Sequence, residues 1–433
     1  MKPMAQAVYW NQKAETMSRD ELAALQLQRL QAAVKTAVER NPFHRERWKQ
    51  AGIKAGDIQS LDDLRLLPFM GKEEFRLGYP LRMLGVPPAE LREMHMSSGS
   101  TGSPVAMGYT AADLDQWADC MARCYRMAGL LPGEGIQITP SFGLFNGGFG
   151  FYHGARKAGQ FIIPTGSGNT PRQIKMINDF QVKGLMGVVS YGIRILEVLQ
   201  ETGGAMPSLK VGIFGAETFS DKLREKIENG LGIETFDIYG MTETGGVGTG
   251  GMDCAAHAGL HQWEDQYIVE ILDPATGRPV PDGAFGEVVY TSLTREAIPL
   301  FRFRTGDLTR VTGRQTCACG RTGLRLDRIT GRVDDMLIVK GVNFFPKQVE
   351  QALMEIPGVL PNYQIVVEEV DGVRDVRVNV EAEAGVTGFQ IEKHLKEKLG
   401  FSPKGDVFAP GQLARQEGKA KRVFYKEPDG TLR

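Results

Sequence analysis

Residues 184–239 decide the fold: they open with Gly184-Leu-Met-Gly-Val-Val189 and close with Thr235-Phe-Asp-Ile-Tyr239. Both stretches are short apolar runs of strand length, and a third such run, Lys-Val-Gly-Ile-Phe, lies between them at 210–214. The segments that separate the three runs have the length of helices. Strands that alternate with helices at this spacing predict a parallel sheet covered by helices on both faces.

The same alternation extends toward the N-terminus. A capping box, Ser18-Arg-Asp-Glu21, opens a long amphipathic helix that Pro42 ends. Two stretches carry other signals: 57–69 has turn and strand features, and 142–151 is typical of an aromatic, glycine-rich loop. The predicted strands are 135–139, 160–164, 184–189, 210–214 and 235–239, and the predicted helices are 18–39, 113–127, 170–180, 192–199 and 220–229.

Beyond Tyr267 the pattern changes to β-rich segments separated by turns, which predicts a small barrel or distorted sheet. A tail of about 100 residues then follows the order strand, helix, strand, strand, helix, and a module of that size is large enough to fold as a unit. We therefore expect an α/β fold. A large domain over residues 1–332 would hold doubly wound sheets and a small β-barrel-like part, followed by a small α+β domain over 333–433.

The bulk properties exclude several classes of protein. The chain has 433 residues, 42% of them hydrophobic, and a formal net charge of −1, so it presents no basic footprint for nucleic acid or an anionic membrane. No apolar run approaches the roughly 20 residues that span a bilayer, and the N-terminus lacks the apolar core of a signal peptide. The odd number of cysteines, five, argues against a secreted disulfide framework. We expect a cytoplasmic protein.

A candidate phosphate site lies in the run at 97–104, Ser-Ser-Gly-Ser-Thr-Gly-Ser-Pro. Glycine lets backbone N–H groups turn toward a ligand, and successive N–H groups with nearby hydroxyls make a concave site for anions. A flexible surface linker is the alternative. The run is not the Gly-x4-Gly-Lys-Ser/Thr form, because Ser103 stands where that motif has lysine. The candidate polyphosphate ligands are Ser97, Ser98, Gly99, Ser100, Thr101 and Gly102.

Two further candidate stretches follow predicted strands: Phe-Gly-Ala-Glu at 214–217 and Tyr-Gly-Met-Thr-Glu at 239–243. Ligands of doubly wound sheets bind outside the carboxyl ends of the strands, so these two stretches are expected to lie near one another. Each of them alone is a weak signal, because short glycine-containing turns are common.

With its segments in this order the chain resembles the adenylate-forming superfamily of acyl-CoA synthetases, adenylation domains and luciferases (the ANL type). Within it, Gly-Leu-Phe-Asn-Gly-Gly at 143–148 and Trp-Glu-Asp at 263–265 indicate the phenylacetate–CoA ligase branch. The matching motifs are the phosphate loop at 97–104, the adenine and magnesium motif at 237–243, the ribose motif Arg-Phe-Arg-Thr-Gly-Asp at 302–307, the hinge at 331–343 and the lysine motif Gly-Lys-Ala-Lys-Arg at 418–422.

The resemblance implies a two-step reaction. A carboxylate attacks the α-phosphorus of ATP to give acyl-AMP and pyrophosphate, and the thiol of coenzyme A then displaces AMP. The resemblance implies catalytic roles for Lys419, Thr242 and Glu243, with Glu243 also holding Mg²⁺, and a hinge near Asp334. Relatives usually carry lysine at the position of Ser103, which predicts a weaker attraction for the ATP phosphates. The other nucleotide-binding residues that it implies are Gly215, Ala216, Glu217, Asp237, Tyr239, Gly240, Met241, Asp307, Arg328 and Arg332.

Two clusters, Cys254-x2-His257-x3-His261 and Cys317-Ala-Cys319, carry thiols and imidazoles at spacings typical of a tetrahedral Zn²⁺ site. The alternative is that these cysteines are scattered by chance. Some relatives in the branch carry a cysteine seven residues before a histidine together with a Cys-x-Cys pair. That resemblance assigns a structural zinc to Cys254, His261, Cys317 and Cys319, with His257 as the spare. The histidines expected to take part in no constellation are His44, His95, His153 and His394.

The residues predicted to line the acid pocket are Phe142, Phe145, Asn146, Gly147, Gly148, Phe149 and Tyr191. Glycines admit a planar ring and aromatic side chains stack on it, which favours an aryl or arylacetic acid over a long fatty acid. We expect an ATP- and Mg²⁺-dependent aryl-CoA ligase that takes a small aromatic acid, ATP and CoA, has no nucleic-acid or membrane partner, and is a possible homodimer. Two alternatives stay open: transfer of the acyl group to a carrier-protein thiol or another acceptor, and a non-catalytic nucleotide-binding relative.

Overall fold

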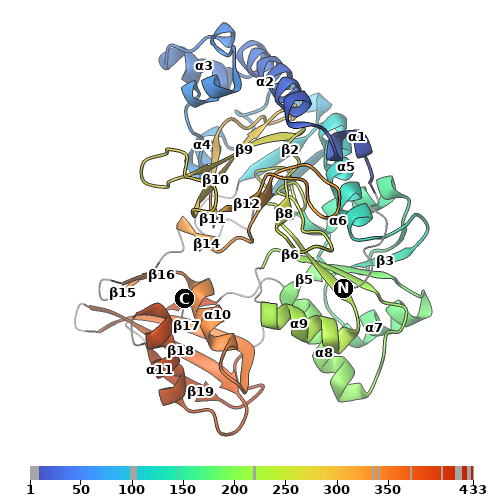
Figure 1. Ribbon diagram of the computed structural model, residues 1–433, viewed down its shortest axis with the longest axis vertical. Helices are drawn as coiled ribbons and strands as arrows, with labels where there is room; N and C mark the ends of the chain where they lie inside the picture. Colours follow the sequence, from blue (N-terminus) through green and yellow to red (C-terminus); the bar gives the residue numbers. More distant parts are fainter. Residues whose placement is uncertain are drawn as a thin grey trace.

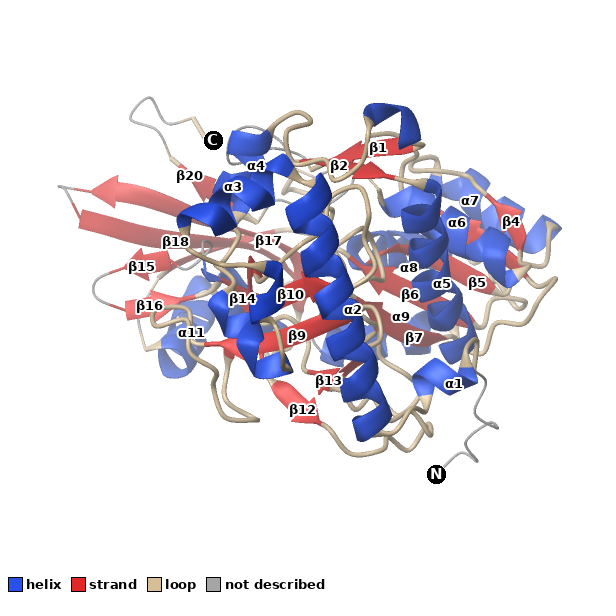
Figure 2. Ribbon diagram, turned by 90° about the horizontal axis from the view of Figure 1, so that it is seen from above, coloured by secondary structure: helices blue, strands red, loops and turns tan. Residues whose placement is uncertain are grey.

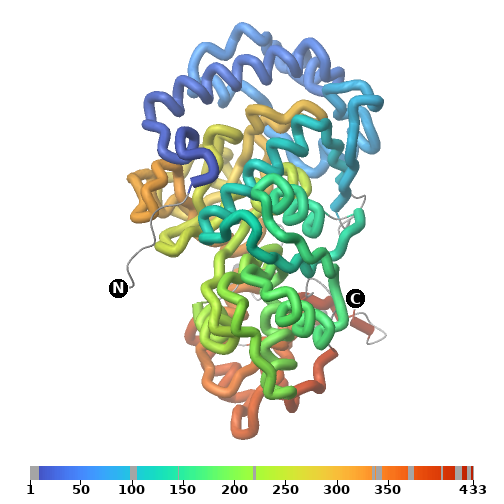
Figure 3. Tube along the Cα trace, turned by 90° about the vertical axis from the view of Figure 1, so that its right-hand side faces the viewer, coloured from blue at the N-terminus to red at the C-terminus, as the bar shows by residue number. Residues whose placement is uncertain are grey.

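The computed structural model describes residues 9–97, 105–144, 146–217, 221–333, 337–339, 342–370, 373–400, 403–414, 422–426 and 431–432. Figure 1 shows helices α2 and α3 at one end of the molecule, sheets in the middle and a small C-terminal unit at the other end, and Figure 3 shows the same order from the side. Within the described residues, no helix is both long enough and apolar enough to cross a membrane.

The central sheet is parallel and has the strand order β4-β3-β5-β6-β7. From β3 the chain first adds β4 on one side and then returns to add the other strands on the opposite side, so the sheet is doubly wound as predicted. The strands are β3 (Gly135–Ile138), β4 (Phe161–Ile163), β5 (Gly184–Val188), β6 (Val211–Gly215) and β7 (Glu234–Ile238).

Successive strand residues face two different cores, because side chains alternate across a sheet. Met186 and Ile213 join the core that also holds helices α5 (Ala111–Met127) and α6 (Gly147–Ala158). Leu185 and Phe214 join a second core with the helices of the opposite face, which are α7 (Thr170–Asp179), α8 (Val189–Thr202) and α9 (Asp221–Leu231). The prediction of helices on both faces is therefore confirmed.

The N-terminal helices cover the other end of the molecule, where α2 lies across β9 and β10 (Figure 2). The Ser18 capping box is confirmed, because its hydroxyl accepts from the Glu21 N–H and the Glu21 carboxylate accepts from the Ser18 N–H. The strand features expected at 57–69 are wrong. Asp63 accepts backbone N–H groups there and favours 3-10 turns. The elements are α1 (Gln12–Glu15), α2 (Arg19–Arg40), α3 (Pro42–Gln50), η1 (Ala55–Asp57), η2 (Leu61–Leu66), α4 (Lys72–Gly78) and η3 (Pro88–Glu90).

The loop expected at 142–151 is wrong in its second half, because α6 begins at Gly147. Tertiary packing outweighs the low helix propensity of glycine here. A Cβ atom at Gly154 would lie 2.1 Å from the Met121 Cβ, and one at Gly150 would lie 2.4 Å from the Trp117 ring. The two glycines therefore let α6 approach α5 closely.

The β-rich part forms an open antiparallel sheet with the order β14-β11-β10-β9, a distorted sheet of the kind predicted. Its strands are β9 (Tyr267–Leu272), β10 (Gly286–Ser292), β11 (Phe303–Thr309) and β14 (Gly331–Arg332). Two further small sets of strands were not predicted. In one, β1 (Glu93–Met96) pairs with β2 (Ala106–Tyr109), and in the other β13 (Arg325–Leu326) pairs with both β12 (Val311–Gly313) and β8 (Leu260–His261).

The C-terminal unit has its own buried core, which includes Val349, Leu353, Val378 and Ile391. A core of its own is what an independent domain needs. The unit meets the rest of the chain where Lys347 Nζ donates to the Ile329 carbonyl. Its elements are β15 (Leu337–Val339), β16 (Val342–Phe344), α10 (Pro346–Met354), β17 (Val359–Val370), β18 (Val373–Ala382), α11 (Gly388–Leu399), β19 (Lys404–Phe408) and β20 (Val423–Tyr425).

Candidate active site

The carboxyl ends of β6 and β7 lie side by side, as predicted, because Gly215 pairs with Ile238. The fit is close: a Cβ atom at Gly215 would lie 2.5 Å from the Ile238 carbonyl oxygen. The chain then turns at Ala216, whose φ of 63° is uncommon for a residue other than glycine. Glu217 is held by the N–H and hydroxyl of Ser190, at 2.8 and 3.1 Å. This edge is therefore ordered by specific contacts.

Tyr239, Asp307 and Arg332 converge although the sequence separates them widely. The Tyr239 hydroxyl donates to Asp307 Oδ2 at 2.6 Å, and Arg332 Nη1 donates to Asp307 Oδ1 at 2.5 Å. The Tyr239 ring lies against Gly250, where a Cβ atom would come within 2.3 Å of it. The structure thus joins the adenine motif to the ribose motif, and Gly240 and Met241 follow directly in the same turn, next to Gly246.

Glu243 is buried, with 4% of its surface exposed, and it follows Thr242 in this turn. Burial raises the pKa of Glu243, while Lys72 and Arg332 lower it and Asp307 raises it. Lys72 was missed by sequence reasoning. It lies two residues after Met70, which bridges to Phe303 of β11, and only this tertiary pairing brings it toward Glu243.

Asp237 lies at the end of β7 and is also buried. Burial and the neighbouring Asp253 raise its pKa to about 6, although Arg328 acts in the opposite direction. Arg328 Nε lies 3.6 Å from Asp237 Oδ2, and its Nη1 donates to Asp221 at 2.6 Å. Arg328 therefore stands beside the adenine motif, where it was predicted to act.

Part of the predicted site lies outside the described residues: Ser98, Gly99, Ser100, Thr101, Gly102, Ser103, Phe145, Asp334 and Lys419. The phosphate run is nevertheless fixed at its two ends, because the Ser97 N–H donates to the Val105 carbonyl and the Val105 N–H donates to the Ser97 hydroxyl, both at 2.9 Å. The ladder of β1 and β2 continues directly from this pair.

Phe142 and Phe149 are the two aromatic residues of the predicted acid pocket that contact each other in the described part of the chain. Their ring centroids lie 5.5 Å apart with an interplanar angle of 83°. Asn146, which lies between Phe142 and Phe149 in the sequence, is buried. A Cβ atom at Gly148 would lie 2.7 Å from the Ser141 carbonyl oxygen. The absence of a side chain at Gly148 therefore makes room for the backbone of Ser141. A Cβ atom at Gly147 would lie 3.5 Å from the Pro140 Cβ, an ordinary van der Waals distance. Tyr191 lies in the first turn of α8 and packs against the core of the opposite face.

Four sulfur and nitrogen ligands come together in the predicted metal cluster. The ligand atoms of Cys254, His261, Cys317 and Cys319 all lie within 4.8 Å of one another, and all four residues are buried. Cys254 Sγ lies 3.8 Å from Cys317 Sγ, and Cys319 Sγ lies 3.5 Å from His261 Nε2. A tetrahedron with Zn–S bonds of about 2.3 Å has S–S edges of about 3.8 Å, so the donors fit a closed Zn²⁺ site.

The spare histidine, His257, is engaged elsewhere. Its Nδ1 lies 2.9 Å from Asp253 Oδ2 and 2.5 Å from Arg224 Nη1. The tight turn of the Cys-x-Cys pair depends on Gly320, which has a φ of 85° and donates its N–H to the Cys317 carbonyl.

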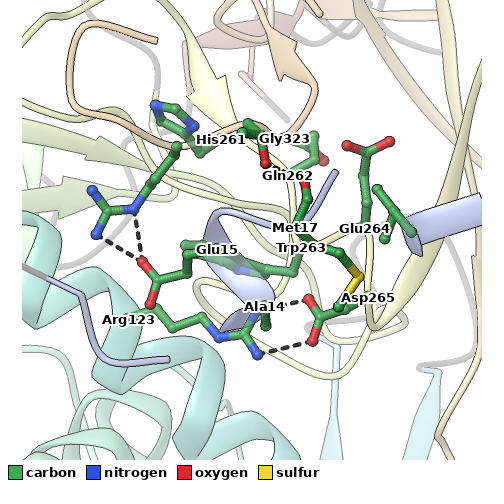
Figure 4. Close-up of a pocket in the computed structure, with 13 residues that line it drawn as sticks. Ala14, Glu15, Met17, Arg123, His261, Gln262, Trp263, Glu264, Asp265 and Gly323 are labelled. Atoms are coloured by element: carbon green, nitrogen blue, oxygen red, sulfur yellow. Dashed lines mark hydrogen bonds and ion pairs between the residues drawn. The ribbon is translucent and has the colours of Figure 1, made fainter. Parts of the chain in front are cut away.

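A small cavity of about 20 Å³ lies between this cluster and the N-terminal helix α1. Figure 4 shows Glu15 of α1 among the residues that line this cavity, with His261 on one side of it and the pair of Arg123 and Asp265 on the other. Glu15 makes a buried ion pair with Arg321 at 2.7 Å, directly after the Cys-x-Cys turn. The cavity belongs to the scaffold and lies apart from the residues of the nucleotide site.

Comparisons with known proteins agree with this geometry. The model of the AMP-binding enzyme family matches residues 13–293, and that of the AMP-binding enzyme C-terminal domain matches 341–426. The phenylacetate-coenzyme A ligase of Escherichia coli (strain K12) is 40% identical over 424 residues, which cover 95% of this chain and 96% of the relative. The enzyme of that name from Aromatoleum evansii is 40% identical over 429 residues, with 96% of each chain covered.

The chain belongs to the phenylacetate–CoA ligase branch of the AMP-binding enzymes. With this branch it belongs to the AMP-forming acid–CoA ligases. The resemblance seen in its motifs is thereby confirmed.

Solved structures of a related ligase distinguish two arrangements of the family. A 2-hydroxyisobutyryl-CoA ligase in the postadenylation state is 28% identical and matches with a TM-score of 0.90, covering 99% of this chain and 94% of that one. The same enzyme in the thioesterification state, 29% identical, matches with a TM-score of 0.74 over 98% and 94%. The fold of this chain is therefore more similar to the postadenylation structure of that enzyme than to its thioesterification structure.

Proposed function

We propose that the chain activates an aromatic carboxylic acid of the phenylacetate type with ATP and Mg²⁺ and then transfers the acyl group to coenzyme A. The convergence of Tyr239, Asp307 and Arg332 beside the buried Glu243 carries the proposal. Phe142 and Phe149 supply an aromatic wall nearby in the fold, which suits a planar ring. The name shared by the curated relatives supports the choice of acid.

In the first half-reaction the residues mainly position two anions and neutralise their charge. Tyr239 and the turn at 215–217 would hold the adenine, and Asp307 with Arg332 the ribose hydroxyls. Thr242 would contact the α-phosphate. Mg²⁺, bound by Glu243 and phosphate oxygens, would withdraw charge from the phosphates. The N–H groups and hydroxyls of 97–102 would hold the β- and γ-phosphates in the absence of a lysine at 103.

Lys419 would bring a compact positive charge to the α-phosphate and the carboxylate as the bond between them forms. In the second half-reaction, rotation near Asp334 would reorient the C-terminal unit, so that the thiol of coenzyme A reaches the acyl-AMP and AMP leaves. Because the C-terminal unit would rotate about this hinge, we place the domain boundary between residues 332 and 333.

The zinc ion would be structural. Cys254, His261, Cys317 and Cys319 would fill all four positions of the metal, which leaves none for a substrate. The site would join the segment after Glu243 to the segment before the hinge, and so stabilise the frame around the nucleotide.

The test measures pyrophosphate release with phenylacetic, indoleacetic, benzoic, aminobenzoic and medium-chain fatty acids, with and without CoA. We expect release that requires an aryl acid, and sustained formation of AMP only with CoA. Lys419→Ala is expected to lower pyrophosphate formation by at least 100-fold, about 2.7 kcal/mol of transition-state stabilisation. Adenylation that is indifferent to CoA would favour a carrier-protein acceptor. Silence with every acid would contradict the proposal.

A further inference from the structure

Two histidines share one carboxylate directly behind the aromatic wall. His95 Nε2 lies 3.0 Å from Glu93 Oε2, and His153 Nε2 lies 3.0 Å from Glu93 Oε1. The expectation that His95 and His153 take part in no constellation is therefore wrong. Glu93 and His95 come from β1, and His153 comes from α6, about 60 residues away. No motif spacing could have linked these positions.

The two imidazoles flank the ring of Phe149. The centroid of the His95 ring lies 5.3 Å from that of Phe149 at 51°, and the ring of His153 lies 6.1 Å away at 29°, nearly parallel. His95 is buried and is itself held edge-on by Tyr109 and Trp117, at 5.4 and 5.8 Å. Phe142 then meets the Phe149 ring edge-on from another direction. The orientation of the Phe149 ring is thus set by neighbours that have little freedom.

The Glu93 carboxylate is ionised at neutral pH. Burial raises the pKa of Glu93, but the hydrogen bonds from His153 and His95 outweigh burial and lower it to about 2. Oε2 of Glu93 lies within hydrogen-bond distance of both ring nitrogens, and Oε1 lies 3.0 Å from that of His153, so an amide in its place would turn its NH₂ group toward the His153 N–H in either orientation. Glu93 is therefore the one member that fixes both imidazoles together.

We infer that Glu93, through His95 and His153, positions the Phe149 ring as the selectivity wall of the acid pocket, so that planar aromatic acids bind better than aliphatic acids of similar size. The inference rests on the proposed function and adds the residues that determine its specificity. Glu93 and the histidines are positioning residues, since they act through Phe149 and do not contact the acid themselves.

The test is a double-mutant cycle on the KM for the acid, using pyrophosphate release. Glu93→Gln is expected to raise the KM for phenylacetate about 2- to 12-fold, the worth of one aromatic contact, while the KM for hexanoate and for ATP stays within twofold. In a Phe149→Leu background the same change is expected to have no further effect, because the ring that it positions is gone. A merely structural role of Glu93 would give the same loss in both backgrounds and would overturn the inference.

The matched control is Glu355→Gln, which removes a carboxylate that also accepts from a histidine, His394 at 3.1 Å, in the C-terminal unit. It is expected to leave all three KM values unchanged. If Glu93→Gln fails to fold, His153→Phe keeps a ring beside Phe149 but removes the N–H, and the same selective rise is expected. An unchanged KM for phenylacetate in the folded variant would overturn the inference alone. A wild-type enzyme that ignores aryl acids would overturn the proposed function first.

Discussion

Asp237 is a buried carboxylate whose ionisation opposes folding. Its side chain is buried at the end of β7, its N–H donates to Asp253 Oδ1 at 2.7 Å, and the two carboxylates repel each other. An ionised carboxylate in such a place costs folding free energy, which only partly returns through Arg328. An ionised aspartate at this position lowers the stability of the fold, although the predicted nucleotide site would use its carboxylate.

The pH dependence of folding tests this reading. The folded pKa of Asp237, about 6, lies above the value of an unfolded aspartate, so its contribution to stability is complete below about pH 4 and is lost as the pH rises through 6. Asp237→Asn is expected to stabilise the chain by about 1–3 kcal/mol at pH 7, and the gain is expected to shrink toward pH 4. Urea unfolding at pH 7, 5.5 and 4 measures it, with the exposed Asp62→Asn as control. A gain of the same size at all three pH values would contradict the assignment.

At this scale the sequence predicted residues that carry a local signal. Cys254, His261, Cys317 and Cys319 have diagnostic chemistry and spacing, and the structure brings them together. Lys72 and the Glu93 cluster carry no such signal. Their partners depend on the pairing of Met70 with β11 and on the packing of α6 against β1, which no local pattern encodes.

At the scale of elements, the N-terminal helix α1 and the Cys-x-Cys turn hold each other. The Tyr9 hydroxyl donates to the Cys319 carbonyl, the Thr322 N–H donates to the Glu15 carbonyl, and the Thr322 hydroxyl donates to the Met17 carbonyl at 2.6 Å. Together with the ion pair of Glu15 and Arg321, these contacts dock α1 on the Cys-x-Cys turn. The predicted zinc site would stabilise this same turn.

Removal of zinc is therefore expected to release α1. In Cys319→Ser the zinc content is expected to fall from about one per chain to near zero, and amide exchange at residues 10–17 to quicken about tenfold or more, while β5 and β6 keep their protection. Hydrogen exchange with mass spectrometry measures both regions in one sample. Cys120→Ala, a buried cysteine outside the cluster, serves as control. Freshly purified wild-type protein without zinc would contradict the metal assignment itself.

The elements that the sequence predicted well are those whose pattern is local and long. The five strands of the parallel sheet and the helices α5, α7, α8 and α9 lie within a few residues of their predicted bounds. Helix α6 was not predicted, because its glycines are weak helix formers alone and are explained only by the surface of α5. Two-residue strands such as β8 and β14 are too short to show a period in the sequence, and they are defined only by their pairing partners.

At the scale of the whole molecule, the proposed function requires two arrangements of the same chain, and this structure has the higher TM-score with the postadenylation structure of the related ligase. In this structure Lys347 of α10 is half-buried against the segment before the proposed hinge, and desolvation lowers its pKa to about 8. We expect rotation of the C-terminal unit at the proposed hinge to break this contact.

A restriction of the hinge is expected to separate the half-reactions. Proline fixes φ near −65°, so Asp334→Pro is expected to lower thioester formation at least tenfold while pyrophosphate release stays within about threefold of wild type. Asp334→Ala leaves the backbone free and is expected to preserve both. Parallel assays of pyrophosphate and of acyl-CoA compare the three proteins. Equal losses of both products in Asp334→Pro would place the hinge elsewhere.

The ion pair of Glu15 and Arg321 also determines when during translation α1 can dock. Its members are 306 residues apart, so a ribosome that adds about 5–20 residues per second makes Arg321 roughly 15–60 s after Glu15. The last ligand of the metal cluster, Cys319, emerges at nearly the same moment. Helix α1 therefore cannot complete its docking until Arg321 has been made, and a zinc ion bound at the predicted cluster would enter the fold at the same stage.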